Sequence, residues 1–283
     1  MALVTTEEIL RKADKEGYAV GAFNVENMEM VQAVIKACEE LNAPGILQTT
    51  PSTVKYAGLD MYVAMVAAEA KKASVPIALH LDHGSSFELA MQALRCGYTS
   101  IMIDGSKLEL EENIALSKSV ADACRPSGIP VEAELGKVGG KEDDMSCDDP
   151  GYTEVADAVK FVEETGVTSL AVAIGTAHGI YKGVPKLDVE RLSEIRKAVS
   201  IPLVLHGASG VPDDQVKECI KRGISKVNFA TELRIAFSDG IKEYLSANPD
   251  TFDPKKYCAA GSAKVTELVK AKIRVCGSEG KAK

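Results

Sequence analysis

Short apolar runs alternate along the chain with longer segments in which apolar residues recur every three to four positions. Most short runs have the length of a β-strand and stay apolar until a polar residue at the end. Continuous apolar runs are typical of strands covered on both faces, as in parallel sheets. The predicted strands are residues 19–24, 45–49, 77–82, 100–104, 131–134, 169–174, 203–206 and 225–229.

The longer segments have the period of an amphipathic α-helix. Thr5 and Glu8 have the spacing of a capping box, so a leader helix is expected to begin there. Prolines at 76, 130 and 202 each stop a helix just before a strand. The predicted helices are residues 28–41, 60–70, 87–96, 110–124, 154–164, 188–199, 213–222 and 231–245, with a tail helix over 261–275.

Eight units of strand and helix predict a (β/α)₈ TIM barrel, with a doubly wound open sheet as the alternative architecture. We expect a single α/β domain over 1–283, with an N-terminal leader helix and a C-terminal helical tail. Residues 136–152 form the longest expected loop, which is glycine-rich and acidic. Long loops in compact domains are often functional.

The composition narrows the class of protein. The chain has 283 residues and a formal net charge of −8, which argues against a dedicated nucleic-acid binder. Its seven cysteines are scattered and form no Cys-x-x-Cys pair, so reduced thiols are expected rather than disulfides or a cysteine zinc site. We find no signal-peptide pattern or apolar run of bilayer length, and therefore expect a cytoplasmic protein with no membrane partner.

The four histidines fall in a pattern that chance does not readily explain. His83 ends the third predicted strand, His178 follows the sixth and His206 ends the seventh, while His80 lies within the third. The carboxyl ends of barrel strands meet at one rim, where barrel enzymes carry their chemistry. Each histidine alone is more often structural. Three imidazoles converging on one point instead form the ligand set of a catalytic zinc with an open position.

Carboxylates and glycines show the same bias towards strand ends. Asp82, Asp104 and Glu134 end the third, fourth and fifth predicted strands, which favours a metal site with acid and base groups over isolated surface charges. Glycine-rich turns over 175–179 and 207–210 follow the sixth and seventh strands, and 228–231 leads from the eighth strand into a helix. Loops after strands seven and eight commonly bind phosphate in barrels.

Together these motifs resemble the class II, zinc-dependent ketose-bisphosphate aldolases. The resemblance is carried by His80-Leu-Asp-His-Gly84, Val131-Glu-Ala-Glu-Leu-Gly136 with Gly139-Gly-Lys-Glu-Asp-Asp144, Ala173-Ile-Gly-Thr-Ala-His-Gly179 and Leu203-Val-Leu-His-Gly-Ala-Ser-Gly210, and spans roughly residues 4–277. It implies reversible cleavage of a ketose 1,6-bisphosphate into dihydroxyacetone phosphate and glyceraldehyde 3-phosphate.

The resemblance also implies the role of individual residues. Zinc is expected on His83, His178 and His206, with an alternative metal position near Asp104 and Glu134. Asp82 corresponds to the acid/base group for the C4 oxygen, and Glu142 in the long loop to the residue that moves a proton on the carbon nucleophile. His80 has two readings, as an orienting residue or as a satisfied interior histidine. The expected substrate-binding residues are Asn24, Thr50, Gly179, Gly207, Ala208, Ser209, Asn228, Phe229, Ala230 and Thr231.

The substrate is less sharply defined than the reaction. Thr49-Thr-Pro51, the Gly-Thr-Ala-His-Gly turn and Asn228-Phe-Ala-Thr231 are similar to the tagatose-1,6-bisphosphate branch. Many fructose-bisphosphate enzymes carry Asp or Asn at the position of Ala230, so tagatose 1,6-bisphosphate is favoured and fructose 1,6-bisphosphate is the alternative. The family implies in addition a monovalent cation (Na⁺ or K⁺), a homodimer or homotetramer, and in some members a stabilising partner subunit.

Two other interpretations compete with a zinc-dependent aldolase. A class I aldolase would form a Schiff base on a lysine, and Lys226 is the lysine that falls inside a predicted strand. That reading leaves the histidines unexplained. A non-catalytic subunit of an aldolase would be expected to lack the ligand histidines or Asp82, all of which are present here.

Overall fold

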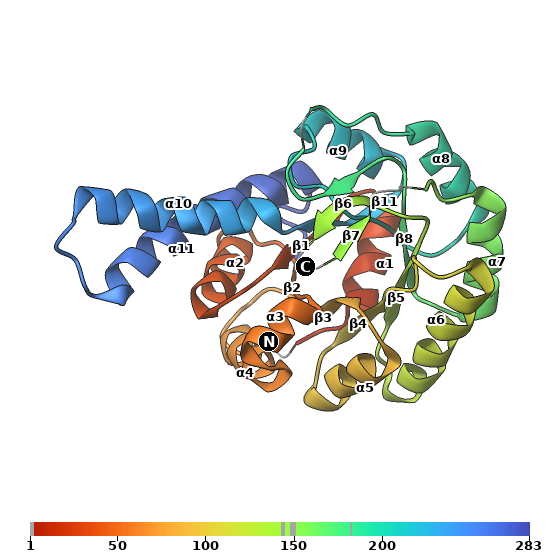
Figure 1. Ribbon diagram of the computed structural model, residues 1–283, viewed down its shortest axis with the longest axis horizontal. Coiled ribbons are helices and arrows are strands. Elements are labelled where there is room, and N and C mark those ends of the chain that lie inside the picture. The colour runs from red at the N-terminus through yellow and green to blue at the C-terminus, as the bar shows by residue number, and fades with distance from the viewer. Residues whose placement is uncertain (1–2, 143–144, 148–150, 182) are drawn as a thin grey trace.

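Parallel strands close into a barrel at the centre of the molecule (Figure 1). The computed structural model describes residues 3–142, 145–147, 151–181 and 183–283, and describes no side chain between 141 and 150. The strand order around the barrel is β1-β11-β10-β8-β5-β4-β3-β2. The ring confirms the predicted (β/α)₈ barrel and excludes the open sheet. Its strands are β1 (Val20–Asn24), β2 (Gly45–Thr49), β3 (Ile77–Gly84), β4 (Ser100–Ile103), β5 (Val131–Leu135), β8 (Ser169–Val172), β10 (Leu203–Leu205) and β11 (Ile224–Phe229).

Helices cover the outside of this ring and bury apolar faces against the strands. Their ends lie within a few residues of the predicted ones, because caps and prolines at the boundaries are legible in the sequence. The helices are α2 (Met28–Glu40), α4 (Leu59–Ala70), α5 (Phe87–Cys96), α6 (Leu110–Cys124), α7 (Val155–Thr165), α8 (Val189–Ala198), α9 (Asp213–Lys221), α10 (Thr231–Ala247) and α11 (Pro254–Cys276). α11 begins seven residues before the predicted tail helix.

The leader helix α1 (Thr6–Glu16) closes the amino-terminal mouth of the barrel. Its N-cap is Thr5, whose hydroxyl accepts the Glu8 amide as the capping-box spacing predicts. Ile9 and Leu10 belong to an apolar cluster that also contains inward residues of β1, β2 and β3. This plug leaves the carboxyl-terminal mouth as the open end of the barrel.

Some elements carry no clear hydrophobic period and were not predicted. α3 (Pro51–Ala57) follows β2, and a 3₁₀ turn η1 (Arg125–Ser127) follows α6. Within the predicted long loop, β6 (Gly139–Glu142) and β7 (Met145–Cys147) form an antiparallel hairpin. β6 also pairs in parallel with β9 (Ala177–His178), so this hairpin is anchored beside the turn after β8.

The helices α10 and α11 pack against each other and extend as an arm to one side of the barrel (Figure 1). The tip of this arm exposes Phe252. Within the described residues, none of the helices combines the length and apolar character needed to cross a membrane.

Candidate active site

Three of the four histidines meet at the carboxyl-terminal mouth of the barrel. The ring centroids of His83 and His206 are 4.7 Å apart, those of His83 and His178 are 5.1 Å apart, and those of His178 and His206 are 6.0 Å apart. One nitrogen from each ring lies within 4.8 Å of the others. The structure therefore brings together the three predicted zinc ligands, although they come from distant parts of the chain.

A distortion at the end of β3 lets two consecutive residues face the same site. Successive side chains of a regular strand point to opposite faces, yet both Asp82 and His83 contact groups at the barrel mouth. His83 has a left-handed φ of +49°, and the pairing of β3 with β4 shifts register between Leu81 and Gly84. Such irregularities re-aim side chains near active sites. Here the irregularity places the predicted base and a predicted metal ligand next to each other.

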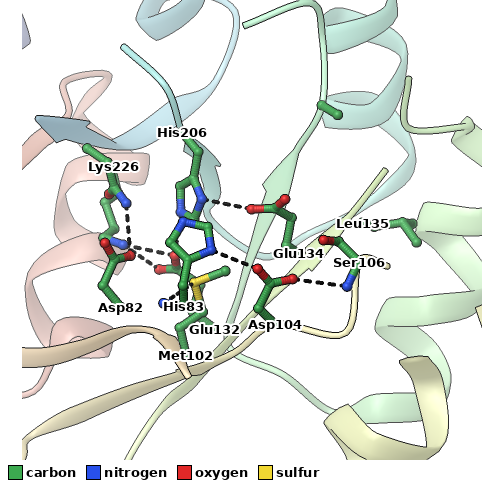
Figure 2. A network of polar contacts seen from close by, with 12 residues as sticks. Asp82, His83, Met102, Asp104, Ser106, Glu132, Glu134, Leu135, His206 and Lys226 are labelled. Atoms are coloured by element: carbon green, nitrogen blue, oxygen red, sulfur yellow. Dashed lines mark hydrogen bonds and ion pairs between the residues drawn. The ribbon is translucent and has the colours of Figure 1, made fainter. Parts of the chain in front are cut away.

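Carboxylates orient two of the three imidazoles (Figure 2). His83 Nδ1 donates to Asp104 Oδ2 at 2.8 Å. His206 Nε2 donates to Glu132 Oε1 at 3.1 Å, while its Nδ1 lies 2.8 Å from Glu134 Oε2. Metal-binding histidines commonly donate their second ring nitrogen to a carboxylate, which fixes the ring. Asp104 and Glu132 contact the rings of His83 and His206 in this way.

The charges around these rings shift their pKa values. Burial disfavours charged His206, but its hydrogen bonds to Glu132 and Glu134 outweigh that effect and raise the pKa of His206 to about 9. Burial alone would raise the pKa of Asp104, yet the bonds from His83 and Ser106 lower it below its usual range. The two carboxylates thus favour the charged form of the His206 ring.

The donor set fits a zinc ion. Zinc is bound at about 2.0–2.1 Å by imidazole nitrogens in tetrahedral sites, which puts ligand atoms roughly 3.4 Å apart. The ligand atoms of His83, His178 and His206 all lie within 4.8 Å of one another. A second cluster of His83, Asp104 and Glu134 also has its ligand atoms within 4.8 Å, which matches the predicted alternative metal position. His83, His178 and His206 would hold the ion, and neutral imidazoles would leave its double charge intact.

Asp82 is fully buried, and side-chain amides hold its carboxylate in place. Asn24 Nδ2 and Gln48 Nε2 donate to Oδ2 at 3.1 Å and 3.0 Å, and Asn228 Nδ2 donates to Oδ1 at 3.1 Å. Gln48 also donates to Asn24 Oδ1 at 2.8 Å. The predicted residues Asn24 and Asn228 therefore contact the predicted base. Sequence reasoning missed Gln48, although a buried amide inside an apolar strand was a usable signal.

The hairpin of β6 and β7 lies against His178, one of the three convergent histidines. Gly140 pairs with His178 and has a φ of +89°, and a side chain at this position would collide with the His178 backbone. Only glycine allows this close approach. The backbone of Glu142 ends β6, but its side chain falls outside the described residues.

The glycine-rich turns after β8 and β10 touch each other. Gly207 has a φ of +65°, and a Cβ there would lie 2.7 Å from the Ala177 backbone. The Tyr181 hydroxyl donates to Gly207 O at 2.8 Å and accepts the Ala177 amide at 2.6 Å. Ser209 Oγ accepts the Ala230 amide at 3.2 Å, which joins this region to the start of α10. The turns predicted to bind phosphate therefore form one surface.

The other predicted substrate-binding residues lie around this surface or behind it. Gly179 follows His178, Ala208 is buried in its turn, and Thr231 begins α10. Thr50 is the buried N-cap residue of α3. The Phe229 side chain stacks on Phe23 in the outer core with centroids 5.8 Å apart, so only its backbone could face a ligand.

A buried ion pair lies deeper in the barrel, below His206. Lys226 Nζ donates to both oxygens of Glu132, at 2.8 Å and 2.9 Å, and contacts His80 Nε2 at 3.4 Å. His80 Nδ1 donates to Ser100 Oγ at 2.7 Å. Burial and the Lys226 charge lower the pKa of His80 well below its usual value. His80 is thus a satisfied interior histidine, and Lys226 is engaged with a carboxylate instead of being poised for a Schiff base.

Comparison with known proteins agrees with this geometry. A family model described as class-II fructose-bisphosphate aldolase matches residues 4–281. The crystal structure of the YdjI aldolase from Escherichia coli K12 is 38% identical, with a TM-score of 0.89 over 99% of this chain and 100% of that chain. A fructose-bisphosphate aldolase from Campylobacter jejuni, 24% identical over 99% of this chain and 97% of its own, shares the fold with a TM-score of 0.84.

The chain belongs to the class-II fructose-bisphosphate aldolase family. It is a lyase of the class II aldolase type. This family is zinc-dependent, and two clusters among the described residues have the composition and spacing of a metal site.

Proposed function

We propose that this protein is a zinc-dependent aldolase that reversibly cleaves a ketose 1,6-bisphosphate, preferably tagatose 1,6-bisphosphate, into dihydroxyacetone phosphate and glyceraldehyde 3-phosphate. One observation carries the proposal. The imidazoles of His83, His178 and His206 converge within 4.8 Å at the barrel mouth, directly beside the buried carboxylate of Asp82. Family membership limits the reaction class, and this arrangement supports the assignment of a metal site and a base within it.

Cleavage of the C3–C4 bond requires that a proton leave the C4 hydroxyl while electrons move towards C3. Zinc held by His83, His178 and His206 would supply Lewis-acid stabilisation of the negative charge that develops as the C3–C4 bond breaks. Asp82 accepts the C4 hydroxyl proton as the aldehyde forms. The amides of Asn24, Gln48 and Asn228 hold the Asp82 carboxylate from both of its oxygens, so the base is fixed before substrate arrives.

The second half of the reaction places a proton on C3 of the three-carbon fragment. We assign this step to Glu142, on the strength of the family resemblance and of the position of its strand. β6 pairs with β9 at His178, so the chain carrying Glu142 runs along the edge of the metal cluster. Closure of this hairpin over substrate would exclude water from a reactive carbanion.

The phosphate of dihydroxyacetone phosphate is assigned to the turns containing Gly179, Gly207 to Ser209, and Asn228 to Thr231. Backbone amides in such turns and at a helix start bind anions well. The N-cap of α10, Ala230, makes no side-chain capping bond, which is consistent with a ligand at this helix start. A monovalent cation near this phosphate and assembly into a homodimer or homotetramer are further parts of the proposal.

Parallel assays on two substrates test the proposal. We expect kcat/KM to be higher for tagatose 1,6-bisphosphate than for fructose 1,6-bisphosphate, because Ala230 replaces the Asp or Asn of many fructose-bisphosphate enzymes. Coupled detection of dihydroxyacetone phosphate measures both reactions. The reverse preference would support the fructose-bisphosphate alternative within the same class.

Chelation and borohydride treatment separate the metal mechanism from a Schiff base. Removal of metal should abolish cleavage, and zinc should restore it. Borohydride added with substrate should leave the enzyme active, because Lys226 is bound to Glu132 and His80. Borohydride inactivation with covalent labelling of a lysine would contradict the zinc mechanism.

A further inference from the structure

A column of buried polar side chains runs along the inside of the barrel, from the leader helix to the metal cluster. Thr6 Oγ1 contacts Ser100 Oγ at 2.7 Å, and Ser100 contacts His80. His80 contacts Lys226, and Lys226 binds Glu132, which accepts from His206. The proposed reaction gives no step to Lys226 or Glu132. Their fully buried charges therefore need a separate explanation.

Buried ion pairs are expensive to build. Desolvation of two charges can cancel their attraction, and apolar residues of similar volume are often at least as stabilising. Lys226 and Glu132 are both about fully buried, with side-chain exposures of 0% and 1%. Stability alone is thus a weak reason for this pair. The pair lies directly beneath His206, one of the three convergent histidines. This position suggests that the pair affects how His206 binds a metal.

The geometry of the pair determines how the His206 ring is held (Figure 2). Lys226 Nζ donates to both Glu132 oxygens, so both oxygens are acceptors in fixed positions. Oε1 then accepts from His206 Nε2 at 3.1 Å. The opposite ring nitrogen, Nδ1, faces Glu134, which is itself a member of the second candidate metal cluster. The ring thus turns Nε2 towards Glu132 and Nδ1 towards Glu134.

We propose that Glu132, held by Lys226, is a positioning residue that fixes the His206 ring and its tautomer, so that Nδ1 is the nitrogen presented to zinc. The inference rests on the zinc site of the proposed function. Loss of such an outer partner typically weakens metal affinity by about 10–100-fold. Asp104 contacts the His83 ring in the same way. Among the described contacts, however, no buried lysine binds Asp104 as Lys226 binds Glu132.

Two double variants test the proposal without leaving a charge buried alone, since single substitutions would do so and destabilise the fold. K226M/E132Q keeps a carbonyl oxygen that can accept from His206 Nε2, whereas K226M/E132M keeps no acceptor. Thermal unfolding establishes that each variant folds. The zinc dissociation constant is then measured by competition with a chromophoric chelator.

We expect K226M/E132M to bind zinc about 10–100-fold more weakly than the wild type, and K226M/E132Q to regain most of that loss. The visible spectrum of the cobalt-substituted protein should change and recover in the same order, because ring orientation alters the ligand field. The matched control is Ser100→Ala, which removes a hydroxyl from the same buried column but leaves the Glu132–His206 bond intact. Its zinc affinity should equal that of the wild type.

Imidazole ¹⁵N shifts of the zinc-loaded wild type give a test that needs no variant. The four histidines make the spectrum small enough to assign. The His206 signals should show Nδ1 bound to metal and Nε2 protonated. Zinc on Nε2, or equal zinc affinity of the two double variants, would overturn the inference while leaving the proposed function in place. A wild type that binds no zinc would instead refute the proposed function.

Discussion

The two ends of the barrel interior are built from different residues on the same strands. On β1, the inward residues Val20 and Ala22 belong to the apolar plug, whereas Asn24 two positions later bonds to Asp82. On β3, Ala78 belongs to the plug, and Asp82 lies at the mouth. β1 and β3 thus each change from apolar to polar along the inward face.

In this barrel the residues that stabilise the fold and the residues of the proposed reaction site lie at opposite ends. The plug buries Ile9 and Leu10 of α1 against apolar inward side chains of β1, β2 and β3. The mouth needs fixed charges, which are tolerated because each has a partner. Asp82 has three amide donors, Asp104 has His83 and Ser106, and Glu132 has Lys226 and His206. Substitutions at the mouth should therefore lower activity, whereas substitutions in the plug should lower the free energy of unfolding.

Removal of a metal ligand at the mouth should have the largest effect. His206→Ala deletes one of the three imidazoles, and we expect cleavage to fall by about 10³-fold or more, since Lewis-acid stabilisation is worth several kcal/mol. Metal analysis should show that zinc is lost, while circular dichroism remains that of a folded barrel. Retention of stoichiometric zinc with normal turnover would contradict the ligand assignment.

Removal of the base should separate chemistry from metal binding at the same end. Asp82→Ala should lower kcat by about 10²–10⁴-fold, the usual range for a general base, while zinc content stays at the wild-type level. Asp122→Ala, on the outer surface of α6, is the matched control and should leave kcat unchanged. Near-normal turnover of Asp82→Ala would show that another group takes the C4 proton.

A substitution in the plug should give the reverse pattern. Leu10→Ala opens a cavity beneath the barrel, and it should lower the free energy of unfolding by about 2–5 kcal/mol without changing kcat/KM. Chemical denaturation measures the loss. Ile235→Ala, a partly exposed apolar residue on α10, should cost far less and serves as the control. A fall in kcat/KM for the folded Leu10 variant would show that the two ends are coupled.

The sequence was most informative where one physical rule applied. Apolar runs ending in a polar residue located all eight barrel strands, and the convergence of strand ends at one rim brought His83, His178 and His206 together. Element boundaries with caps or prolines were also legible. The predicted capping box at Thr5 is present in the structure.

The sequence was less informative where tertiary contacts decide the structure. The hairpin of β6 and β7 has no alternating apolar pattern, since it is held by pairing with β9. The left-handed backbone at His83 has no sequence signal, because residues other than glycine adopt a positive φ uncommonly and no local motif marks this one. Glu132 and Lys226 were visible as charges inside strands, but their pairing depends on the closure of the barrel.

The smallest expected effect concerns the proton that occupies the mouth when zinc is absent. The pKa of His206 is raised to about 9 in the metal-free protein, so at pH 7.5 the ring is charged and must lose a proton to bind zinc. We expect zinc uptake to release about one proton there, and zinc affinity to rise about tenfold per pH unit up to roughly pH 9. Calorimetry in two buffers of different ionisation enthalpy measures the release. The same titration at pH 9.5 is the control, because His206 has then lost most of its proton and the release should be smaller. Zinc binding at pH 7.5 without proton release would mean that Glu132 and Glu134 do not hold a charged ring, and the mouth would then resemble the uncharged plug more closely than its geometry indicates.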